Sequence, residues 1–282
     1  MECPICQGLS NRLFTKYGYW IHQCQICNFQ FAELVLSGEH TQKVYSDEYF
    51  QRGKAGYFDY LKEGKLLRNR GRYYTQILKG YLQPETILDV GTAAGFILKG
   101  FLDGGWKGKG LEPNSTMANY GKKHLGLDIE VGTLENFSSN QRYQVISMIQ
   151  VVSHFTNLQA AFQVAAQLTK PQELWLIETW NRRSLTAKVM GKYCHEYSPP
   201  SVLHWFSPQD LQRLAQQFSF QKIDCGKPPK LISGIHAKSL LQYKLQDSPL
   251  CKLLYPILKL IPDHFTITYP GEDLFYVLFQ KQ

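Results

Sequence analysis

The sequence predicts an α/β protein with a small cysteine-rich module at its N-terminus, and three observations lead to this prediction. Two C-x-x-C pairs lie within the first 27 residues. A short apolar run over 86–90 is followed by a glycine loop and a helical pattern over 96–102, which indicates a strand, a tight turn and a helix. A second short strand, 108–111, runs into an acidic residue. The chain has 282 residues and a hydrophobic content of 44%, which is enough for a full core.

The cysteine pairs predict a zinc ribbon over residues 1–35. A C-x-x-C turn points two thiolates at one ion, and two such turns form a closed tetrahedral set with no open position for chemistry. A module of about thirty residues cannot build a sufficient core, so metal binding would supply its folding energy. Four unligated cysteines are the alternative, which the specific spacing disfavours. The predicted Zn²⁺ ligands are Cys3, Cys6, Cys24 and Cys27.

Residues 36–84 are predicted to link this module to the main domain. The stretch 45–57 is aromatic and turn-rich, which indicates a loop that packs against another part of the protein. From 59 to 81 the apolar residues follow a helical period, and Gly80 and Pro84 end the helix. We interpret the basic side of this helix as a solvated face; it carries Lys62, Lys65, Arg68 and Arg72.

The glycine loop predicts a site for a nucleotide-like ligand. Asp89 lies at the end of the first strand, and Gly91 and Gly95 let the backbone approach a ligand without a Cβ clash. The following helix offers free N–H groups to a ligand's carboxylate. Glu112 ends the next strand about twenty residues after the glycines, where a carboxylate can accept both ribose hydroxyls.

The sequence of this loop does not match two other nucleotide-binding motifs. A dinucleotide fingerprint needs glycine at the first, third and sixth positions, which here are Gly91, Ala93 and Phe96. The loop has no lysine followed by serine or threonine, so a P-loop fails as well. The spacing suits a smaller ligand with no pyrophosphate. A glycine turn in an unrelated α/β protein is the alternative on the loop alone.

Four stretches together resemble class I S-adenosylmethionine-dependent methyltransferases. The run Ile87–Phe96 resembles their first motif, and Gly110–Pro113 resembles their second. Gly132–Glu135 is similar to the loop that flanks the adenine, and Val145–Phe155 is similar to the fourth strand with the turn after it. The resemblance implies that the nucleotide-like ligand is S-adenosylmethionine.

The chain further resembles a bacterial subgroup of these enzymes that has an N-terminal zinc ribbon. The similarity lies in 45–60 and in the strings 195–200 and 204–207. The resemblance implies a Rossmann-like seven-stranded sheet with helices on both faces, within a domain over 85–282. It also implies an antiparallel last strand, at 273–280.

The resemblance implies which residues surround the cofactor, and two positions depart from the family pattern. Ala93 replaces the middle glycine of the first motif, and Ser153-His154 stands where the subgroup often has Glu-His. The residues implied beside the methionine part are Asp89, Gly91, Thr92, Ala93, Gly95 and Phe96. Those implied beside the ribose are Glu112 and Pro113, and those beside the adenine are Thr133 and Leu134. Gln150 is implied to lie near the cofactor after the fourth strand.

Histidines are the candidate bases on the acceptor side. Methyl transfer from a sulfonium is a direct displacement, so a base is needed only where the acceptor must lose a proton. His154 follows the fourth strand, at the sheet edge where ligands bind, and is the first candidate. His195, His204 and Tyr197 come next, within the segment 181–208 that we expect to cover the site. A structural hydrogen-bonding role is the alternative for each histidine.

A small-molecule acceptor is favoured over nucleic acid. Enzymes that methylate base amino groups carry Asn-or-Asp-Pro-Pro-aromatic after the fourth strand, where this chain reads Ile149–Val152. Between the first and last ribbon cysteines the only basic side chains are Arg12 and Lys16. The formal charge is +8, and the basic loop Arg182–Lys192 predicts an anionic acceptor such as a nucleotide-linked sugar. The alternative function is a binding protein on this scaffold, which either keeps the cofactor without catalysis or recognises nucleic acid or protein.

Residues 228–264 are predicted to form a helical insertion between the last two strands. Its amphipathic pattern predicts a cap on the sheet or a dimer contact, so we expect a monomer or a homodimer. Peripheral contact of 231–262 with a membrane surface is the alternative. The longest apolar runs are too short to span a bilayer, and no apolar run precedes Cys3, so we expect a cytoplasmic protein without a signal peptide.

Overall fold

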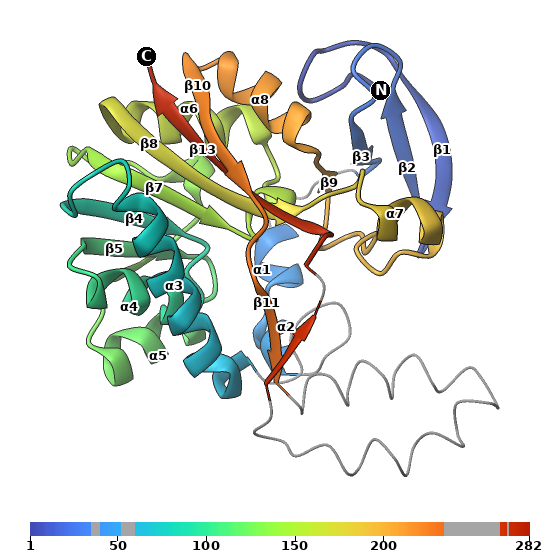
Figure 1. The fold of residues 1–282 in the computed structure, drawn as a ribbon. Coiled ribbons are helices and arrows are strands. Elements are labelled where there is room, and N and C mark those ends of the chain that lie inside the picture. The colour runs from blue at the N-terminus through green and yellow to red at the C-terminus, as the bar shows by residue number, and fades with distance from the viewer. Residues whose placement is uncertain (35–39, 52–59, 234–265, 270) are drawn as a thin grey trace, which may run out of the picture.

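The centre of the molecule is a seven-stranded sheet (Figure 1). The computed structural model describes residues 1–34, 40–51, 60–233, 266–269 and 271–282. The strand order is β10-β13-β8-β7-β4-β5-β6, and β13 runs antiparallel to both of its neighbours while the other pairs are parallel. This topology confirms the predicted Rossmann-like sheet with an antiparallel last strand. The strands are β4 (Thr86–Val90), β5 (Lys107–Glu112), β6 (Ile129–Val131), β7 (Tyr143–Ile149), β8 (Thr169–Trp180), β10 (Phe220–Gly226) and β13 (Leu274–Lys281).

Helices cover both faces of the sheet because successive side chains of each strand point in opposite directions. In β8, Trp175 and Ile177 lie in one buried cluster, and Leu174 and Leu176 lie in the other. The first cluster is covered by α6 (Leu158–Leu168) and α8 (Pro208–Gln216). The second is covered by α3 (Gly64–Leu78), α4 (Phe96–Asp103) and α5 (Ser115–Leu125).

Helix α3 carries three of the four basic residues that the sequence places on one helix face, and Lys62 lies just before it, in η1 (Tyr60–Glu63). Arg68 and Arg72 are partly exposed, as expected, but both form ion pairs with Asp103 of α4, at 2.6 Å and 2.7 Å. These pairs lower the pKa of Asp103 to about 2. The basic face of α3 therefore also ties two helices of one layer together.

The shorter helices lie at the ends of the strands and in the links between them. They are α1 (His40–Val44), α2 (Asp47–Gln51), α7 (Leu185–Met190), and the 3₁₀ helices η1 (Tyr60–Glu63), η2 (Leu134–Asn136), η3 (Val152–His154) and η4 (Gly191–Tyr193).

The N-terminal module forms a second sheet that includes one strand of the main domain. Its strands are β1 (Ser10–Lys16), β2 (Tyr19–Cys24) and β3 (Gln30–Ala32), followed by β9 (His204–Trp205) from the segment after β8. The predicted boundary at residue 35 therefore separates neighbours that share one hydrogen-bonded sheet.

The predicted insertion 228–264 begins with a strand that pairs with another strand just after its end. Strands β11 (Lys230–Ser233) and β12 (Thr266–Tyr269) pair antiparallel with each other. The helices predicted between them lie outside the described residues, as does most of the stretch 231–262 for which membrane contact is the alternative. Within the described part of the chain, no helix combines the length and the apolar character needed to cross a membrane.

Candidate active site and metal centre

The four ribbon cysteines meet at one point. The Sγ atom of Cys6 lies 3.4 Å from that of Cys24 and 3.5 Å from that of Cys27. The Sγ atoms of Cys3 and Cys27 are 3.6 Å apart, and all four sulfurs lie within 4.8 Å of one another. Two thiolates bound at about 2.3 Å to one tetrahedral Zn²⁺ are about 3.8 Å apart. Backbone N–H groups of Ile5 and Cys27 also point at the sulfurs, at 3.4 Å. The donor set therefore fits the predicted structural zinc.

The glycine loop between β4 and α4 takes a left-handed backbone conformation three times, with φ of 68° at Gly91, 49° at Ala93 and 83° at Gly95. A Cβ atom on Gly95 would lie 2.3 Å from Cδ1 of Leu127. The loop lies against the end of β5, because the N–H groups of Gly91 and Thr92 both donate to the Leu111 carbonyl. The sequence locates this turn correctly because its cause is local.

The Gly95→Ala substitution is expected to destabilise the protein more than Gly126→Ala. Gly126 has a similar φ of 65°, but no described atom lies within 4 Å of its Cβ position. Both changes incur left-handed strain of about 1–2 kcal/mol. Only Gly95→Ala displaces Leu127, which adds about 1–3 kcal/mol. Urea unfolding of the two variants measures the difference, and equal losses would contradict the close packing of the loop.

Two buried carboxylates lie at the ends of β4 and β5. Asp89 accepts hydrogen bonds from the hydroxyls of Thr92 (2.6 Å) and Ser147 (2.5 Å), and burial raises its pKa to about 6. Glu112 accepts backbone N–H groups of Ala93 and Asn114, each at 2.8 Å, and burial raises its pKa to about 7. Each carboxylate oxygen of Glu112 keeps a free lone pair, so the two oxygens can accept hydrogen bonds from two hydroxyls of a diol such as a ribose.

The remaining predicted cofactor residues lie along the same edge of the sheet. Thr133 and Leu134 begin η2, and Glu135 beside them accepts the N–H and the hydroxyl of Thr156 in the turn after β7. Gln150 follows the last residue of β7 and has a φ of 56°. Pro113 is half-buried after Glu112, and Phe96 is buried at the start of α4.

The linker before α3 folds over this edge, which the sequence indicates only as a packed aromatic loop. The Asn114 side chain donates to the Tyr45 carbonyl (2.9 Å) and to Asp47 (3.0 Å). The Tyr45 hydroxyl donates to the Ser201 carbonyl at 2.6 Å and lies 2.9 Å from Nδ1 of His154. Segments 45–47, 112–114 and 154 are therefore joined around one site.

Glu178 on β8 is a further residue that sequence reasoning missed. It is fully buried and accepts hydrogen bonds from the Gln150 side chain, at 2.7 Å, and from the Tyr74 hydroxyl. It also forms an ion pair with Arg70 at 3.0 Å. Its backbone carbonyl also accepts the Gln150 N–H. The only sequence signal is an acidic residue within the apolar run of β8.

The Tyr74→Phe substitution is expected to cost about 1–3 kcal/mol of unfolding free energy, because the buried Glu178 carboxylate loses one of its donors. Tyr73→Phe, one residue earlier on α3 and only part-buried, is the matched control. Thermal and urea unfolding measure both. A Tyr74→Phe protein as stable as the control would show that the hydroxyl contributes nothing.

The predicted acceptor-side residues do not gather in one place. His154 lies at the site edge, with Nδ1 2.7 Å from the Ser201 carbonyl. His204 stacks on Phe29 of the ribbon, and Tyr197 donates to the Gln30 side chain at 2.7 Å, so both lie where the ribbon meets the main domain. His195 is exposed and pairs with Glu196, which follows it.

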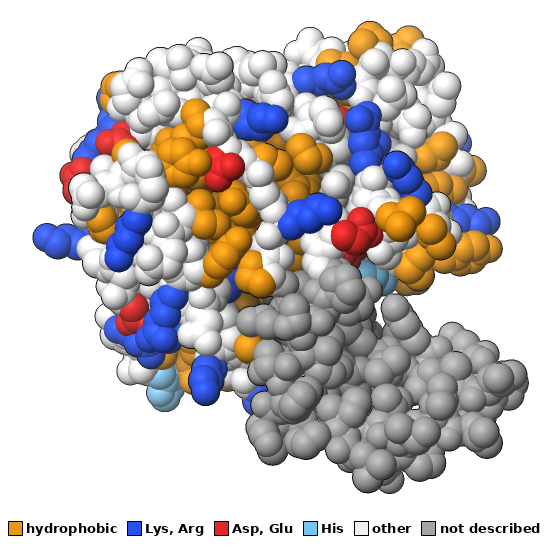
Figure 2. Space-filling view, in the orientation of Figure 1, with side chains coloured by type: hydrophobic (Ala, Val, Ile, Leu, Met, Phe, Trp, Pro, Cys, Tyr) orange, Lys and Arg blue, Asp and Glu red, His pale blue; other side chains and the backbone are white. Residues whose placement is uncertain are grey.

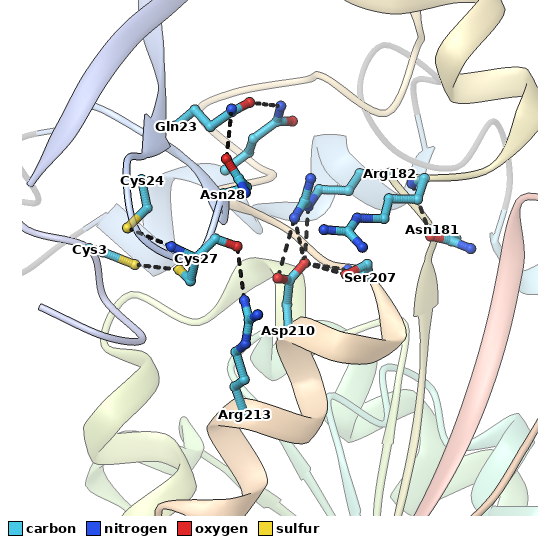
Figure 3. Close-up of polar contacts among 12 residues, drawn as sticks. Cys3, Gln23, Cys24, Cys27, Asn28, Asn181, Arg182, Ser207, Asp210 and Arg213 are labelled. Carbon is cyan, nitrogen blue, oxygen red and sulfur yellow. Dashed lines mark hydrogen bonds and ion pairs between the residues drawn. The ribbon is translucent and has the colours of Figure 1, made fainter. Parts of the chain in front are cut away.

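Arg182, the first residue of the basic loop 182–192, is paired within the protein, whereas the anionic acceptor predicted from that loop stays a prediction. The Arg182 side chain is 7% exposed and forms a 2.9 Å ion pair with Asp210, which is fully buried (Figure 3). Asp210 also accepts the Ser207 N–H and hydroxyl, which completes the capping box of α8. Arg182 therefore neutralises an internal carboxylate and fixes the start of a helix.

A family model described as a methyltransferase domain matches residues 64–224, more than half of the chain. The chain belongs to this family. Together with the sheet topology, the match confirms the predicted class I S-adenosylmethionine-dependent methyltransferase and its cofactor.

Known methyltransferases resemble the chain in sequence and in fold. The ubiquinone biosynthesis O-methyltransferase of Rhodopseudomonas palustris (strain BisB5) is 26% identical over 141 residues, or 46% of this chain and 56% of that protein. Its counterpart in Bradyrhizobium sp. (strain ORS 278) is 25% identical over 138 residues, or 45% and 54%. The chain spans about half the length of these curated relatives.

Two solved structures share the fold at low sequence identity. One is a SAM-dependent methyltransferase from Archaeoglobus fulgidus, with a TM-score of 0.53 at 16% identity over 83% of this chain and 97% of that one. The other is magnesium protoporphyrin IX methyltransferase from Synechocystis, solved with bound SAH, with a TM-score of 0.53 at 11% identity over 86% and 100%.

Proposed function

We propose that this chain transfers the methyl group of S-adenosylmethionine to a hydroxyl oxygen of a small-molecule acceptor, with His154 as the general base. The observation that supports this most directly is the hydrogen bond between His154 Nδ1 and the Ser201 carbonyl, at 2.7 Å. A carbonyl only accepts, so the network assigns the ring proton to Nδ1. The lone pair then lies on Nε2, which is the form that a base needs.

The surroundings of His154 favour its neutral form. Burial lowers the pKa of His154, and this outweighs the Ser201 carbonyl and the Glu196 carboxylate, which raise it. His154 ends η3, which begins three residues after the last residue of β7, Ile149, so it lies at the carboxyl edge of the sheet. A neutral, oriented imidazole at that edge can take a proton from an acceptor held beside the cofactor.

The same surroundings favour oxygen as the methylated atom. When bound, S-adenosylmethionine supplies an electrophilic methyl group. An amine attacks through its own lone pair, whereas an alcohol or a phenol becomes strongly nucleophilic only as its proton leaves, so a dedicated base is most useful for oxygen. The name of the curated relatives, O-methyltransferases, supports this proposal. We propose that Asp89, the glycine loop, Glu112 and the start of η2 hold the cofactor.

Nucleic-acid recognition has less support. Arg12 of the ribbon is paired with Glu33 at 2.9 Å, and Lys16 donates to the Lys192 carbonyl at 3.0 Å, so both basic side chains between the cysteines make contacts within the protein. On the face in Figure 2, basic side chains lie scattered among apolar and acidic ones. This arrangement differs from the continuous basic stripe that binds phosphates.

A pair of matched acceptors tests the proposal. The purified protein is incubated with methyl-¹³C-labelled S-adenosylmethionine and either catechol or ortho-phenylenediamine, which present oxygen and nitrogen on the same ring. We expect label in an O-methyl product, identified by its ¹³C chemical shift, and much less with the diamine. The same donor added to a metabolite extract then identifies the natural acceptor. More label with the diamine than with catechol, or label on nitrogen or carbon of the natural acceptor, would contradict the proposal.

A further inference from the structure

Side chains of the methyltransferase domain donate hydrogen bonds to backbone carbonyls in the cysteine turns of the ribbon. Arg213 of α8 donates to the Cys27 carbonyl at 3.0 Å and points directly at it (Figure 3). The side chain of Gln159 donates to the Pro4 carbonyl at 2.9 Å. Three bonds of this kind reach both C-x-x-C turns; the third joins Gln217 to the Ile5 carbonyl at 2.7 Å. The turns that would close around zinc are therefore also the turns that the main domain contacts.

The ribbon continues into the main domain by strand pairing. In β3, Gln30 and Phe31 lie opposite Trp205 and His204 of β9, and the Ala32 N–H donates to the Leu203 carbonyl at 2.8 Å. Phe29, two residues after Cys27, is completely buried and packs against Phe206 and His204. This contact is part of one apolar cluster that also holds three of the four cysteines, Cys3, Cys24 and Cys27.

Strand β9 in turn holds the turn that carries His154. The Leu203 N–H donates to the Ser153 carbonyl at 2.8 Å, and Nε2 of His204 bonds to the Phe155 carbonyl at 2.9 Å. Ser201, just before β9, supplies the carbonyl that fixes Nδ1 of His154. Residues on both sides of His154, and His154 itself, are therefore bonded to the segment that pairs with the ribbon.

We propose that the zinc ribbon is a positioning element for His154. The order of β3 depends on the metal, because about thirty residues with little core of their own are ordered by metal binding. Strand β3 pairs with β9, and Leu203 and His204 form hydrogen bonds with the turn 153–155. The glycine loop follows β4 and Glu112 ends β5, and within the described residues neither strand pairs with the ribbon sheet. Zinc binding therefore acts first on the turn that carries His154, and it reaches the end of β5 only indirectly, through contacts such as Tyr45 with Asn114.

Hydrogen exchange with and without zinc tests this positioning role. The purified protein is compared before and after chelation, with metal analysis to confirm the loss of one zinc per chain. We expect amide exchange to accelerate about tenfold or more at Leu203 and within 152–155. Exchange in β4 and β5, and the Kd for S-adenosylmethionine by calorimetry, should change by less than about twofold. Unchanged exchange at 152–155 in metal-free protein, or equal acceleration in β4, would overturn the proposal.

A single substitution separates the strand contact from the metal. Ala32→Pro removes the N–H that bonds to Leu203 and leaves all four cysteines in place. Ala32→Ser keeps that N–H and is the matched control. We expect the proline protein to retain one zinc per chain and yet show the fast exchange at Leu203 and 152–155, whereas the serine protein matches the parent. A proline protein with zinc bound and parental exchange would overturn the proposal.

The importance of this positioning for catalysis rests on the proposed role of His154, but the two can fail separately. Exchange and cofactor binding are measured without an acceptor, so they report on the ribbon even if oxygen is not the methylated atom. Conversely, the labelled-acceptor experiment uses the zinc-loaded protein and does not depend on how His154 is held.

Discussion

Replacing His154 with glutamine is expected to lower kcat for methyl transfer to a phenolic acceptor by about 10²–10⁴-fold, the usual contribution of a positioned base. Glutamine has a side-chain N–H that can still donate to the Ser201 carbonyl, but it has no basic lone pair to replace Nε2. The Kd for S-adenosylmethionine should remain within about twofold of the parent, because the loss concerns only the transition state. Initial rates with catechol and calorimetry with the cofactor measure the two quantities.

His195→Gln is the matched control for this variant. His195 lies in the segment 181–208, but its side chain is 53% exposed and pairs with its neighbour Glu196. We expect parental kcat and parental cofactor affinity from it. A His154→Gln protein with the same kcat as this control would exclude the base, and a large loss of cofactor affinity would instead indicate damage to the fold around Gln150.

The pH dependence gives an independent check on His154. Burial lowers its pKa, so the neutral form persists to a lower pH than for an ordinary histidine. The active form is unprotonated, and kcat should therefore be flat through neutral pH and fall only below the usual histidine range. A kcat that fell on the acid side already near neutral pH would indicate a different base.

The backbone of the glycine loop and the place of Glu112 at a strand end were predictable because their causes are local. The strand predicted at 86–90 is β4, and the turn at Gly91 and Gly95 follows from backbone conformations that glycine adopts easily. The position of Glu112 was predictable from the length of one strand–helix–strand unit, because that length determines where along the chain the next strand ends. Each of these inferences needs only residues within about 25 positions of one another.

The acceptor side was not predictable because its contacts join distant parts of the chain. Arg182 appeared free to bind an anion until the fold brought it to Asp210, and Tyr197 and His204 face a ribbon strand that is more than 160 residues earlier. Tyr45 reaches His154 across 109 positions. Residue types suggested that these segments were functional, but which of them meet is decided by packing that no local pattern encodes.

Glu112 is expected to make cofactor binding depend on pH. Burial raises the pKa of its carboxyl to about 7 in the ligand-free fold, so the folded protein holds this proton more tightly than the unfolded chain. The contribution of Glu112 to stability is therefore greatest at low pH and is lost as the pH rises toward 7. Ribose hydroxyls would donate to the ionised form, so cofactor binding should lower this pKa and tighten as the pH rises.

The expected slope is steep enough to measure by calorimetry. One unit below the Glu112 pKa about a tenth of the carboxyl is ionised, so the Kd for S-adenosylmethionine at pH 6 should be about tenfold weaker than its plateau above pH 8. Glu112→Gln should weaken binding at the plateau by about 1.5–3 kcal/mol, the usual range for hydrogen bonds to a charged group. It should also remove most of the slope.

The glutamine variant separates Glu112 from the other titrating groups. Asp89, whose pKa is raised to about 6, and the amino group of the cofactor itself also change charge in or near this range, and both remain in the Glu112→Gln complex. Any slope that this variant retains belongs to them. If the parent and the variant showed parallel curves between pH 6 and 8, Glu112 would not be the group that holds the ribose, and the diol would have to bind elsewhere along the edge between β5 and η2.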